Sequence, residues 1–206
     1  MSPNCALIVL DVQYDFLPGG ALAVPDGDAV IPVVNRVARR FENVLLTQDW
    51  HPSGHQSFAS SHPRHRPFDT ITLPYGEQVL WPDHCVQGTR GAALAAELDV
   101  PHAQLVIRKG YHAHTDSYSA FLEADRKTRT GLDGYLAARG IEEVFCLGLA
   151  TDYCVTWTAL DAIHFGLRAS VLLDGCRAID VGGSLDRAVA ALKDARVAIL
   201  DSASIG

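Results

Sequence analysis

The segment 148–155, with the sequence GLATDYCV, contains the residue best suited to covalent chemistry, Cys154. An apolar run ending at Leu149 predicts a buried strand, and the pattern of residues 153–165 predicts a helix. Cys154 would then lie in the first turn of a helix, at the carboxyl end of a strand. Free N–H groups and the positive end of the helix dipole favour a thiolate there, so we interpret Cys154 as a nucleophile.

A cysteine nucleophile needs a group that accepts its proton and a charge that stabilises the thiolate. Asp11 ends the first apolar run of the chain, and Lys109 ends the third. Asp11 could act as the base, while Lys109 could hold carboxylate and thiolate together and tune both pKa values. On spacing alone, the alternative is that Lys109 is a solvated strand end and Asp11 a cap of the next turn, which we consider the less favoured interpretation. Backbone N–H groups at the turn before Cys154 could stabilise an oxyanion, which indicates acyl transfer.

Histidines are concentrated in one stretch: five of the nine fall between His51 and His84. Asp49 and His51 are two residues apart, so on an extended backbone their side chains point the same way. Together with His84 they would form a site of one carboxylate and two imidazoles with open positions, which suits Zn, Fe or Mn. The spacing alone is weak evidence for this site, because its third member is distant in the sequence.

Three aromatic residues near these positions, Phe16, Trp81 and Tyr118, could wall a small flat ligand. Ordinary packing beneath a long loop is an equally good interpretation for each of them. The loops in question are 48–91 and 110–130, which are polar and show little regular pattern. Long irregular segments of this kind in a compact domain are usually functional or disordered, and the aromatic residues of the first argue against disorder.

The elements that must position these residues are short apolar strands alternating with helices. The strands lack a clean apolar–polar alternation, as expected for strands buried on both faces. The pattern predicts an α/β fold, a three-layer αβα arrangement around a mostly parallel six-stranded sheet. In such sheets ligands bind at the carboxyl ends of the strands, where Asp11, Asp49, Lys109 and Cys154 would converge. We expect strands at 6–12, 44–47, 105–107, 144–149, 169–173 and 197–200, and helices at 29–41, 92–98, 132–139, 155–165 and 185–194.

Composition narrows the class of protein. The 206 residues, 48% of them hydrophobic, predict a single domain over 1–206. The net charge is -7, and the basic cluster at Arg126, Lys127 and Arg129 is too small for a nucleic-acid footprint. No apolar run is long enough to span a membrane, and the N-terminus does not resemble a signal peptide, so we expect a cytoplasmic protein. Five widely spaced cysteines, an odd number, argue against a disulfide framework.

The chain resembles the nicotinamidases of the isochorismatase-like cysteine hydrolase superfamily. The resemblance runs from the first strand to the last. WPDHCVQGT together with ATDYCV is typical of the nicotinamidase branch. The matching stretches are LDVQYDF (10–16), TQDWHP (47–52), LWPDHCVQG (80–88), RKG (108–110), DSYSAF (116–121) and GLATDYCV (148–155).

The resemblance implies hydrolysis of nicotinamide to nicotinate and ammonia in NAD salvage, with pyrazinamide as a second substrate. It also implies a thioester intermediate and one divalent metal ion whose shell the pyridine nitrogen of the substrate completes. Some relatives carry a further histidine ligand where this chain has Ser57, so Ser57 or water would fill that place. By resemblance the triad is Asp11, Lys109 and Cys154; the metal ligands are Asp49, His51 and His84; the pocket residues are Phe16, Trp81 and Tyr118; and the N–H groups of Ala150 and Cys154, after a cis peptide, form the oxyanion hole.

Two other interpretations are compatible with parts of the pattern. The first is an amidohydrolase of the same superfamily that acts on another small amide; Trp81 and the three metal ligands argue for an aromatic substrate instead. The second is a non-catalytic metal-binding or redox-responsive module, which would give Asp11 and Lys109 no role. A nucleotide-binding dehydrogenase is excluded because the chain has neither GxGxxG nor GxxxxGK[ST]. The expected partner is a small molecule, with no nucleic acid or membrane, and the sequence allows a homo-oligomer.

Overall fold

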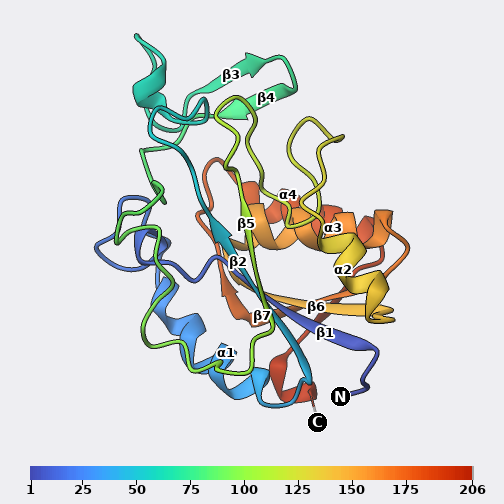
Figure 1. Cartoon of the computed structure of the whole chain (residues 1–206). Coiled ribbons are helices and arrows are strands. Elements are labelled where there is room, and N and C mark those ends of the chain that lie inside the picture. Colours follow the sequence, from blue (N-terminus) through green and yellow to red (C-terminus); the bar gives the residue numbers. More distant parts are fainter. Residues whose placement is uncertain (206) are drawn as a thin grey trace.

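The computed structural model describes residues 1–205, and its centre is a six-stranded sheet with the order β5-β2-β1-β6-β7-β8 (Figure 1). Every neighbouring pair in this sheet is parallel. The predicted α/β fold with a six-stranded parallel sheet is therefore confirmed. The strands are β1 (Cys5–Leu10), β2 (Asn43–Asp49), β5 (Leu105–Lys109), β6 (Glu143–Leu149), β7 (Arg168–Arg177) and β8 (Ala198–Leu200).

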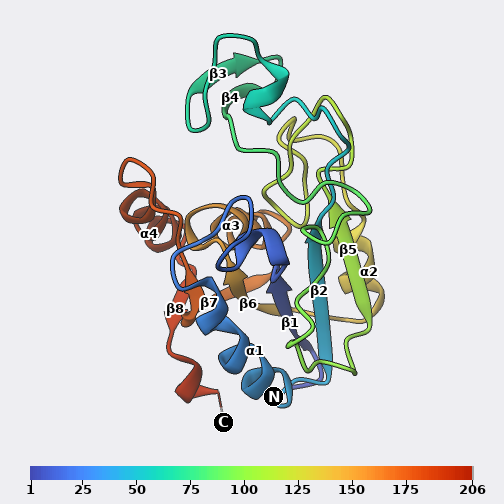
Figure 2. The same ribbon diagram turned by 90° about the vertical axis from the view of Figure 1, so that its left-hand side faces the viewer.

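Helices cover both faces of the sheet. Helix α1 (Val30–Ala38) packs on β6 and β7 from one side, while α3 (Thr156–His164) packs on the same strands from the other (Figure 2). Helices α2 (Leu132–Ala138) and α4 (Ser184–Asp194) lie on the face of α3. The chain that leaves β1 crosses through α1 on one face, and the chain that leaves its neighbour β6 crosses through α3 on the other. Such a change of direction forms a crevice at the carboxyl ends of the strands.

The burial of the strands follows their place in the sheet. All residues of β1 and β2 are buried, because helices or loops cover both faces of the central strands. Strand β5 lies at the edge, and its residues alternate between half-buried and exposed before the buried Lys109. The apolar stripe of α1 that faces the core consists of Val30, Ile31, Val34, Val37 and Ala38, spaced as a helix face requires.

One predicted helix, 92–98, is wrong: this stretch forms turns. The reason is tertiary. The side-chain amides of Gln13 and Gln48 both donate to the carbonyl oxygen of Ala92, at 2.9 and 2.7 Å, and the carbonyl of Ala93 accepts from the backbone of Tyr14 at 3.1 Å. These carbonyls are therefore not available for a helical ladder.

The long loop 48–91 contains a hairpin that the sequence did not predict. Strands β3 (Thr70–Leu73) and β4 (Gly76–Val79) pair antiparallel and stand beyond the carboxyl ends of the main sheet (Figures 1 and 2).

No helix within residues 1–205 is long and apolar enough to cross a membrane. The remaining helical elements are short 3-10 turns at Tyr14–Phe16, Gly27–Ala29, Ala59–Ser61 and Ser202–Ser204, and a π-helical turn at Thr151–Val155.

Candidate active site

The four strand-end residues expected to converge do so. Asp11 follows β1, Asp49 and Lys109 end β2 and β5, and Cys154 lies in the π-helical turn after β6. The close approach of β1 and β6 depends on Gly148, which has φ +122° and whose added Cβ would lie 2.2 Å from the carbonyl oxygen of Leu10. Only glycine fits there, and this tight contact brings the turn that carries Cys154 beside Asp11.

Lys109 is the centre of the charged cluster and is fully buried. Its Nζ lies 2.9 Å from Asp11 Oδ2 and 3.3 Å from Cys154 Sγ, and it donates to the carbonyl of Ser117 at 3.1 Å. It also forms a hydrogen-bonded ion pair with Asp49 Oδ1. Burial opposes the charge on Lys109, but Asp11 and Asp49 outweigh it and raise its pKa well above the usual value. Lys109 is therefore a fixed ammonium.

The carboxylate of Asp11 is held from one side by Thr47. The Thr47 hydroxyl donates to Asp11 Oδ1 at 2.5 Å and accepts from the Asp11 backbone at 3.1 Å. The other oxygen, Oδ2, is buried and faces the Lys109 ammonium at 2.9 Å. Burial raises the pKa of Asp11, although Lys109 opposes the shift. A buried carboxylate with raised proton affinity is suited to accept a proton.

The resting thiol differs from the expectation. The prediction that the start of the helix favours a thiolate is wrong for the free site: burial raises the pKa of Cys154 well above its usual value, Lys109 lowers it, and the charges of Asp11 and Asp49 raise it further. Burial is the largest influence, and the two carboxylates act in the same direction, so together they outweigh the ammonium of Lys109. The thiol is therefore neutral at rest, and attack requires a base to remove its proton.

Asp49, His51 and His84 come together in the arrangement predicted for metal ligands. Asp49 Oδ2 lies 3.6 Å from His51 Nε2 and 3.8 Å from His84 Nε2, and all three side chains are buried. His51 Nδ1 lies 2.8 Å from the carbonyl oxygen of Gly110, and His84 Nδ1 lies 2.8 Å from that of Pro82. Each Nδ1 must carry a hydrogen to donate to a carbonyl, so both Nε2 atoms present lone pairs to the same point.

The orientation of His51 depends on Gly110, which has φ +66°. A Cβ at this position would lie 2.5 Å from His51 Cε1 and 2.8 Å from His51 Nδ1. Any larger residue would push the imidazole away from the carbonyl that fixes its tautomer. Residue 110 directly follows Lys109, so one short segment positions both the cation and a metal-site histidine.

His55 and Ser57 form a closed pair beside this cluster. The ring of His55 lies 4.4 Å from that of His51, between ring centres. Its Nδ1 accepts from the Ser57 hydroxyl at 2.7 Å, and its Nε2 lies 3.0 and 3.2 Å from the carbonyl oxygens of His112 and Thr115. Both ring nitrogens of His55 are therefore engaged, and His55 supports the site without a free lone pair to offer.

A small cavity brings the two halves of the site together. The predicted aromatic residues Phe16, Trp81 and Tyr118 line it together with the predicted metal ligands, Ala150 and Cys154. Asp11 and Lys109 lie buried behind Cys154 rather than on the cavity wall. The peptide bond between Leu149 and Ala150 is cis, as the resemblance implied.

Four further residues of the cavity wall were missed by sequence reasoning: Leu22, Asp116, Tyr153 and Ile179. Asp116 lies in the stretch DSYSAF and Tyr153 in the stretch GLATDYCV, but neither residue was assigned a role from the sequence alone. Tyr153 packs edge-on against Trp81, with ring centres 4.8 Å apart. No sequence signal marks Leu22 or Ile179, because only the folded chain brings them to the cavity.

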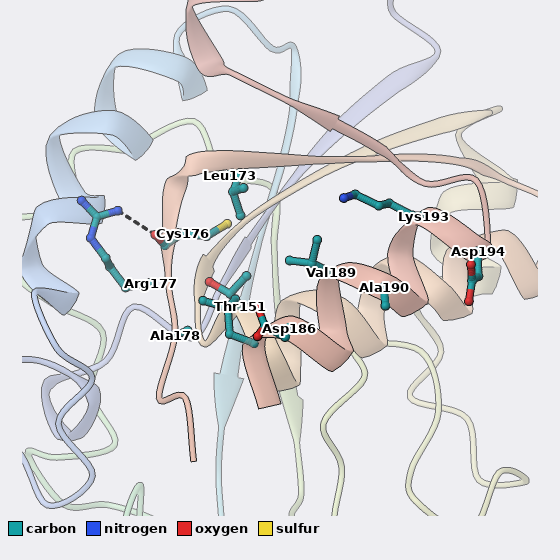
Figure 3. A pocket seen from close by; sticks show the side chains of 11 residues that line it. Thr151, Leu173, Cys176, Arg177, Ala178, Asp186, Val189, Ala190, Lys193 and Asp194 are labelled. Carbon is teal, nitrogen blue, oxygen red and sulfur yellow. Dashed lines mark hydrogen bonds between the residues drawn. The ribbon is translucent and has the colours of Figure 1, made fainter. Parts of the chain in front are cut away.

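A wider hollow lies elsewhere, between β7 and α4 (Figure 3), with a volume of about 650 Å³. None of the predicted site residues lines it. Its apolar floor includes Leu173 and Val189, and the Arg177 guanidinium donates to the carbonyl of Cys176 at 2.7 Å. The hollow is open and its charged groups are dispersed along its rim, so it lacks the converging polar groups of a reaction site.

Comparison with known proteins agrees with this geometry. Residues 5–204 match the isochorismatase domain model. A nicotinamidase from Acinetobacter baylyi is 60% identical over 185 residues, which cover 90% of this chain and 86% of the relative. The structure of an Acinetobacter baumanii nicotinamidase/pyrazinamidase superposes with a TM-score of 0.99 at 54% identity and covers all of both chains.

A more distant structure is informative about the metal site. A pyrazinamidase from Pyrococcus horikoshii, solved in complex with zinc, has a TM-score of 0.79 at 35% identity, covering 97% of this chain and 99% of the relative. The resemblance deduced from the sequence motifs is thus confirmed, and the chain belongs to the isochorismatase domain family, on the branch of the nicotinamidases.

Proposed function

We propose that this protein is a nicotinamidase that hydrolyses nicotinamide to nicotinate and ammonia through a thioester on Cys154. One observation carries the proposal: Cys154 and a set of metal-ligand side chains line the same aromatic-walled cavity. The base and the cation of Cys154 lie buried behind it. A flat ring that carries a nitrogen and an amide matches this cavity, because the nitrogen can face the metal-ligand cluster while the amide faces Cys154. The high identity to nicotinamidases supports this substrate.

The donor set fits a divalent metal ion. Asp49, His51 and His84 would hold it, because two histidines have their tautomers fixed by backbone carbonyls and the carboxylate faces both. When bound, the ion would act as a Lewis acid toward the ring nitrogen of the substrate and so orient the ring. The set suits Zn, Fe or Mn, and the zinc complex of the Pyrococcus relative favours zinc.

The first half of the reaction forms the thioester. Asp11 takes the proton of the Cys154 thiol as the sulfur attacks the amide carbonyl. The N–H groups of Ala150 and Cys154 stabilise the oxyanion of the tetrahedral intermediate. When the C–N bond breaks, Asp11 returns its proton to the leaving amine, and ammonia departs.

The second half releases the acid. Asp11, again a carboxylate, removes a proton from a water molecule that attacks the thioester carbonyl. As the C–S bond breaks, Asp11 passes this proton to Cys154, and the acid leaves as nicotinate after losing its own proton to solvent. Lys109 keeps its charge throughout and offsets the negative charge that moves between Asp11 and Cys154. Phe16, Trp81 and Tyr118 enclose the ring.

Pyrazinamide keeps a ring nitrogen and a carboxamide in the same relation, so we include it as a second substrate. The Acinetobacter baumanii and Pyrococcus structures carry pyrazinamidase in their names. We further propose a single domain over 1–206, a cytoplasmic location, a small-molecule partner without nucleic acid or membrane, and a homo-oligomer as a compatible assembly.

The decisive experiment measures ammonia release from nicotinamide by metal-loaded wild type and by Cys154→Ala. Release by the wild type alone is the expected result. No release by metal-loaded wild type contradicts the proposal, and a panel of other small amides then tests the neighbouring possibility, a related amidohydrolase. The aromatic walls favour the flat heteroaromatic amides over aliphatic members of that panel.

A further inference from the structure

The hairpin β3–β4 makes an unusual contact with the candidate site. Of its strand residues, Thr70–Leu73 and Gly76–Val79, seven are exposed or half-buried, and only Gln78 is buried, at 1% exposure. A polar side chain is thus the single deeply inserted residue of an otherwise superficial hairpin. Burying a side-chain amide is costly unless its groups are hydrogen-bonded, so its partners explain its presence.

The amide of Gln78 is engaged at both ends. Nε2 lies 2.8 Å from Asp116 Oδ2, 3.1 Å from the Tyr118 hydroxyl and 2.7 Å from the carbonyl of Val79, so its two hydrogens are shared among three acceptors. Oε1 accepts from the Tyr75 hydroxyl at 3.0 Å. Two of these partners, Asp116 and Tyr118, line the cavity that contains Cys154. Gln78 itself does not reach the cavity wall.

Asp116 depends on neutral donors. Its carboxylate is buried, its hydrogen-bond donors are a backbone N–H and a side-chain amide, and a ring nitrogen of His51 and one of His55 lie within 4.8 Å of it. Its Oδ1 accepts from the backbone of Ser117 at 2.8 Å, and its Oδ2 accepts from Gln78. Without the amide, one oxygen of a buried carboxylate would lose its donor, and the side chain would have to move to find another.

Tyr118 links Gln78 to Trp81, the second aromatic residue of the cavity wall. Its hydroxyl oxygen accepts from Gln78 Nε2 and also from Trp81 Nε1, both at 3.1 Å. Trp81 and Tyr118 stand nearly perpendicular, with ring centres 6.3 Å apart. The amide therefore fixes one aromatic wall directly and contacts the second through a shared hydroxyl.

We propose that Gln78 is a positioning residue that sets the affinity for the substrate ring by fixing Tyr118 and Asp116. This inference rests on the proposed function, since the ring in question is that of the heteroaromatic amide. Gln78 touches neither Cys154 nor its helpers, so its loss changes ring binding rather than the chemical step. The hairpin is then a determinant of specificity.

The test compares Gln78→Met with the matched control Glu77→Met. Methionine keeps the length of glutamine but removes the amide, and Glu77 is an exposed neighbour on the same strand. For Gln78→Met we expect KM for nicotinamide to rise about fivefold, the equivalent of one net hydrogen bond, at an unchanged kcat. The control keeps both constants. An unchanged KM, or a fall in kcat alone, overturns the inference.

A double-mutant cycle with Tyr118→Phe tests whether Gln78 acts on substrate binding through the Tyr118 hydroxyl. Tyr118→Phe removes only the hydroxyl, so its effect on KM and that of Gln78→Met should be strongly non-additive; additivity overturns the route through Tyr118. If Gln78→Met fails to fold, Tyr75→Phe removes the donor to Oε1 and should give a smaller rise in KM.

A second readout separates this inference from the proposed function. The indole N–H resonance of Trp81, assigned with Trp81→Phe, reports on the bond to Tyr118 in the ligand-free protein. A shift in Gln78→Met supports the positioning role even if wild type does not hydrolyse nicotinamide, which would refute only the proposed function. An unshifted resonance overturns the inference while leaving the activity intact.

Discussion

Asp49 and Lys109 lie directly opposite each other on neighbouring parallel strands and form an ion pair at the carboxyl edge of the sheet. Asp49 turns one oxygen to the lysine and the other to His51 and His84. Burial opposes the charge on Asp49, but Lys109 and the two histidines outweigh it and lower its pKa well below the usual value. One carboxylate thus joins the nucleophile cluster to the metal-ligand cluster.

Replacing Lys109 by methionine should make the thiol a weaker acid and the enzyme inactive. Lys109 lowers the pKa of Cys154, so its removal leaves the thiol facing Asp11 and Asp49 without that opposing charge. The rate of iodoacetamide alkylation should rise with pH in both proteins, with the rise displaced to higher pH in the variant. We expect kcat to fall about 100-fold or more.

The matched control for this prediction is Arg108→Met, on the same strand. The Arg108 guanidinium stacks on the Trp50 ring, 3.8 Å from its centre, and does not contact Cys154. Its alkylation profile should match wild type. If Lys109→Met and wild type gave the same alkylation profile, Lys109 would not influence the pKa of the Cys154 thiol, and the prediction would be wrong.

Cys154→Ala should abolish turnover while leaving the fold and the metal content intact. The change removes one buried sulfur, so the melting temperature should shift by only a few degrees, equivalent to about 1 kcal/mol. Cys5→Ala is the control, because Cys5 is a buried thiol at the opposite end of β1. Turnover by the Cys154 variant close to that of wild type would exclude a thioester on this residue.

Removing the metal should stop turnover without unfolding the chain. The backbone that carries these ligands has its own hydrogen bonds, from the pairing of β2 with β5 at Asp49 and from His51 N–H to the carbonyl of Cys85, so the apo-protein should keep its circular dichroism spectrum. Activity after dialysis against a chelator, and after adding back Zn, Mn or Fe, checks this together with elemental analysis. His84→Ala should lower metal content and the exposed His65→Ala should not; full activity in a metal-free sample would contradict the site.

Asp152 offers a test of how the cavity wall is held. Its carboxylate accepts from the backbone of Ile179 at 3.1 Å and of Asp180 at 2.8 Å, and from the Ser184 hydroxyl at 2.5 Å. Asp152→Asn weakens this anchoring of Ile179 and should cost about 2 kcal/mol of unfolding free energy and raise KM. Denaturant unfolding and steady-state kinetics measure both.

The control is Asp174→Asn, a carboxylate with the same kind of partners. Asp174 accepts from the backbone of Ser202 at 2.7 Å and from its hydroxyl at 2.5 Å, remote from the cavity. This variant should lose stability and keep KM. Equal KM values for the two variants would show that the anchoring of Ile179 does not affect substrate binding.

Much of the site could be predicted from the sequence because parallel strands end at one edge. Asp11, Asp49, Lys109 and Cys154 follow four apolar runs, which predicts that they lie at one edge of the sheet. They come within contact because β5, β2, β1 and β6 are consecutive neighbours, an order that the runs themselves do not encode. The ion pair between Asp49 and Lys109 could not be predicted. It depends on the register of β2 against β5, which no local pattern encodes.

Other features were unpredictable for the same reason: tertiary contacts decide them. The alanine-rich stretch 92–98 has helical propensity, yet the amides of Gln13 and Gln48 bind the Ala92 carbonyl instead. The resting state of Cys154 depends on how completely it is buried with two carboxylates, and sequence position suggested the opposite. The role of Gln78 depends on partners about forty residues away.

The place of β5 at the edge of the sheet has a consequence for the lifetime of the enzyme. Within the described chain, β5 has one strand neighbour, β2, and it is β5 that delivers Lys109 to the centre of the cluster. Edge elements detach at lower free energy than a sheet interior. We therefore expect that on heating Lys109 leaves the cluster before the core unfolds, so that activity is lost at a lower temperature than the circular dichroism signal and returns on cooling from that range.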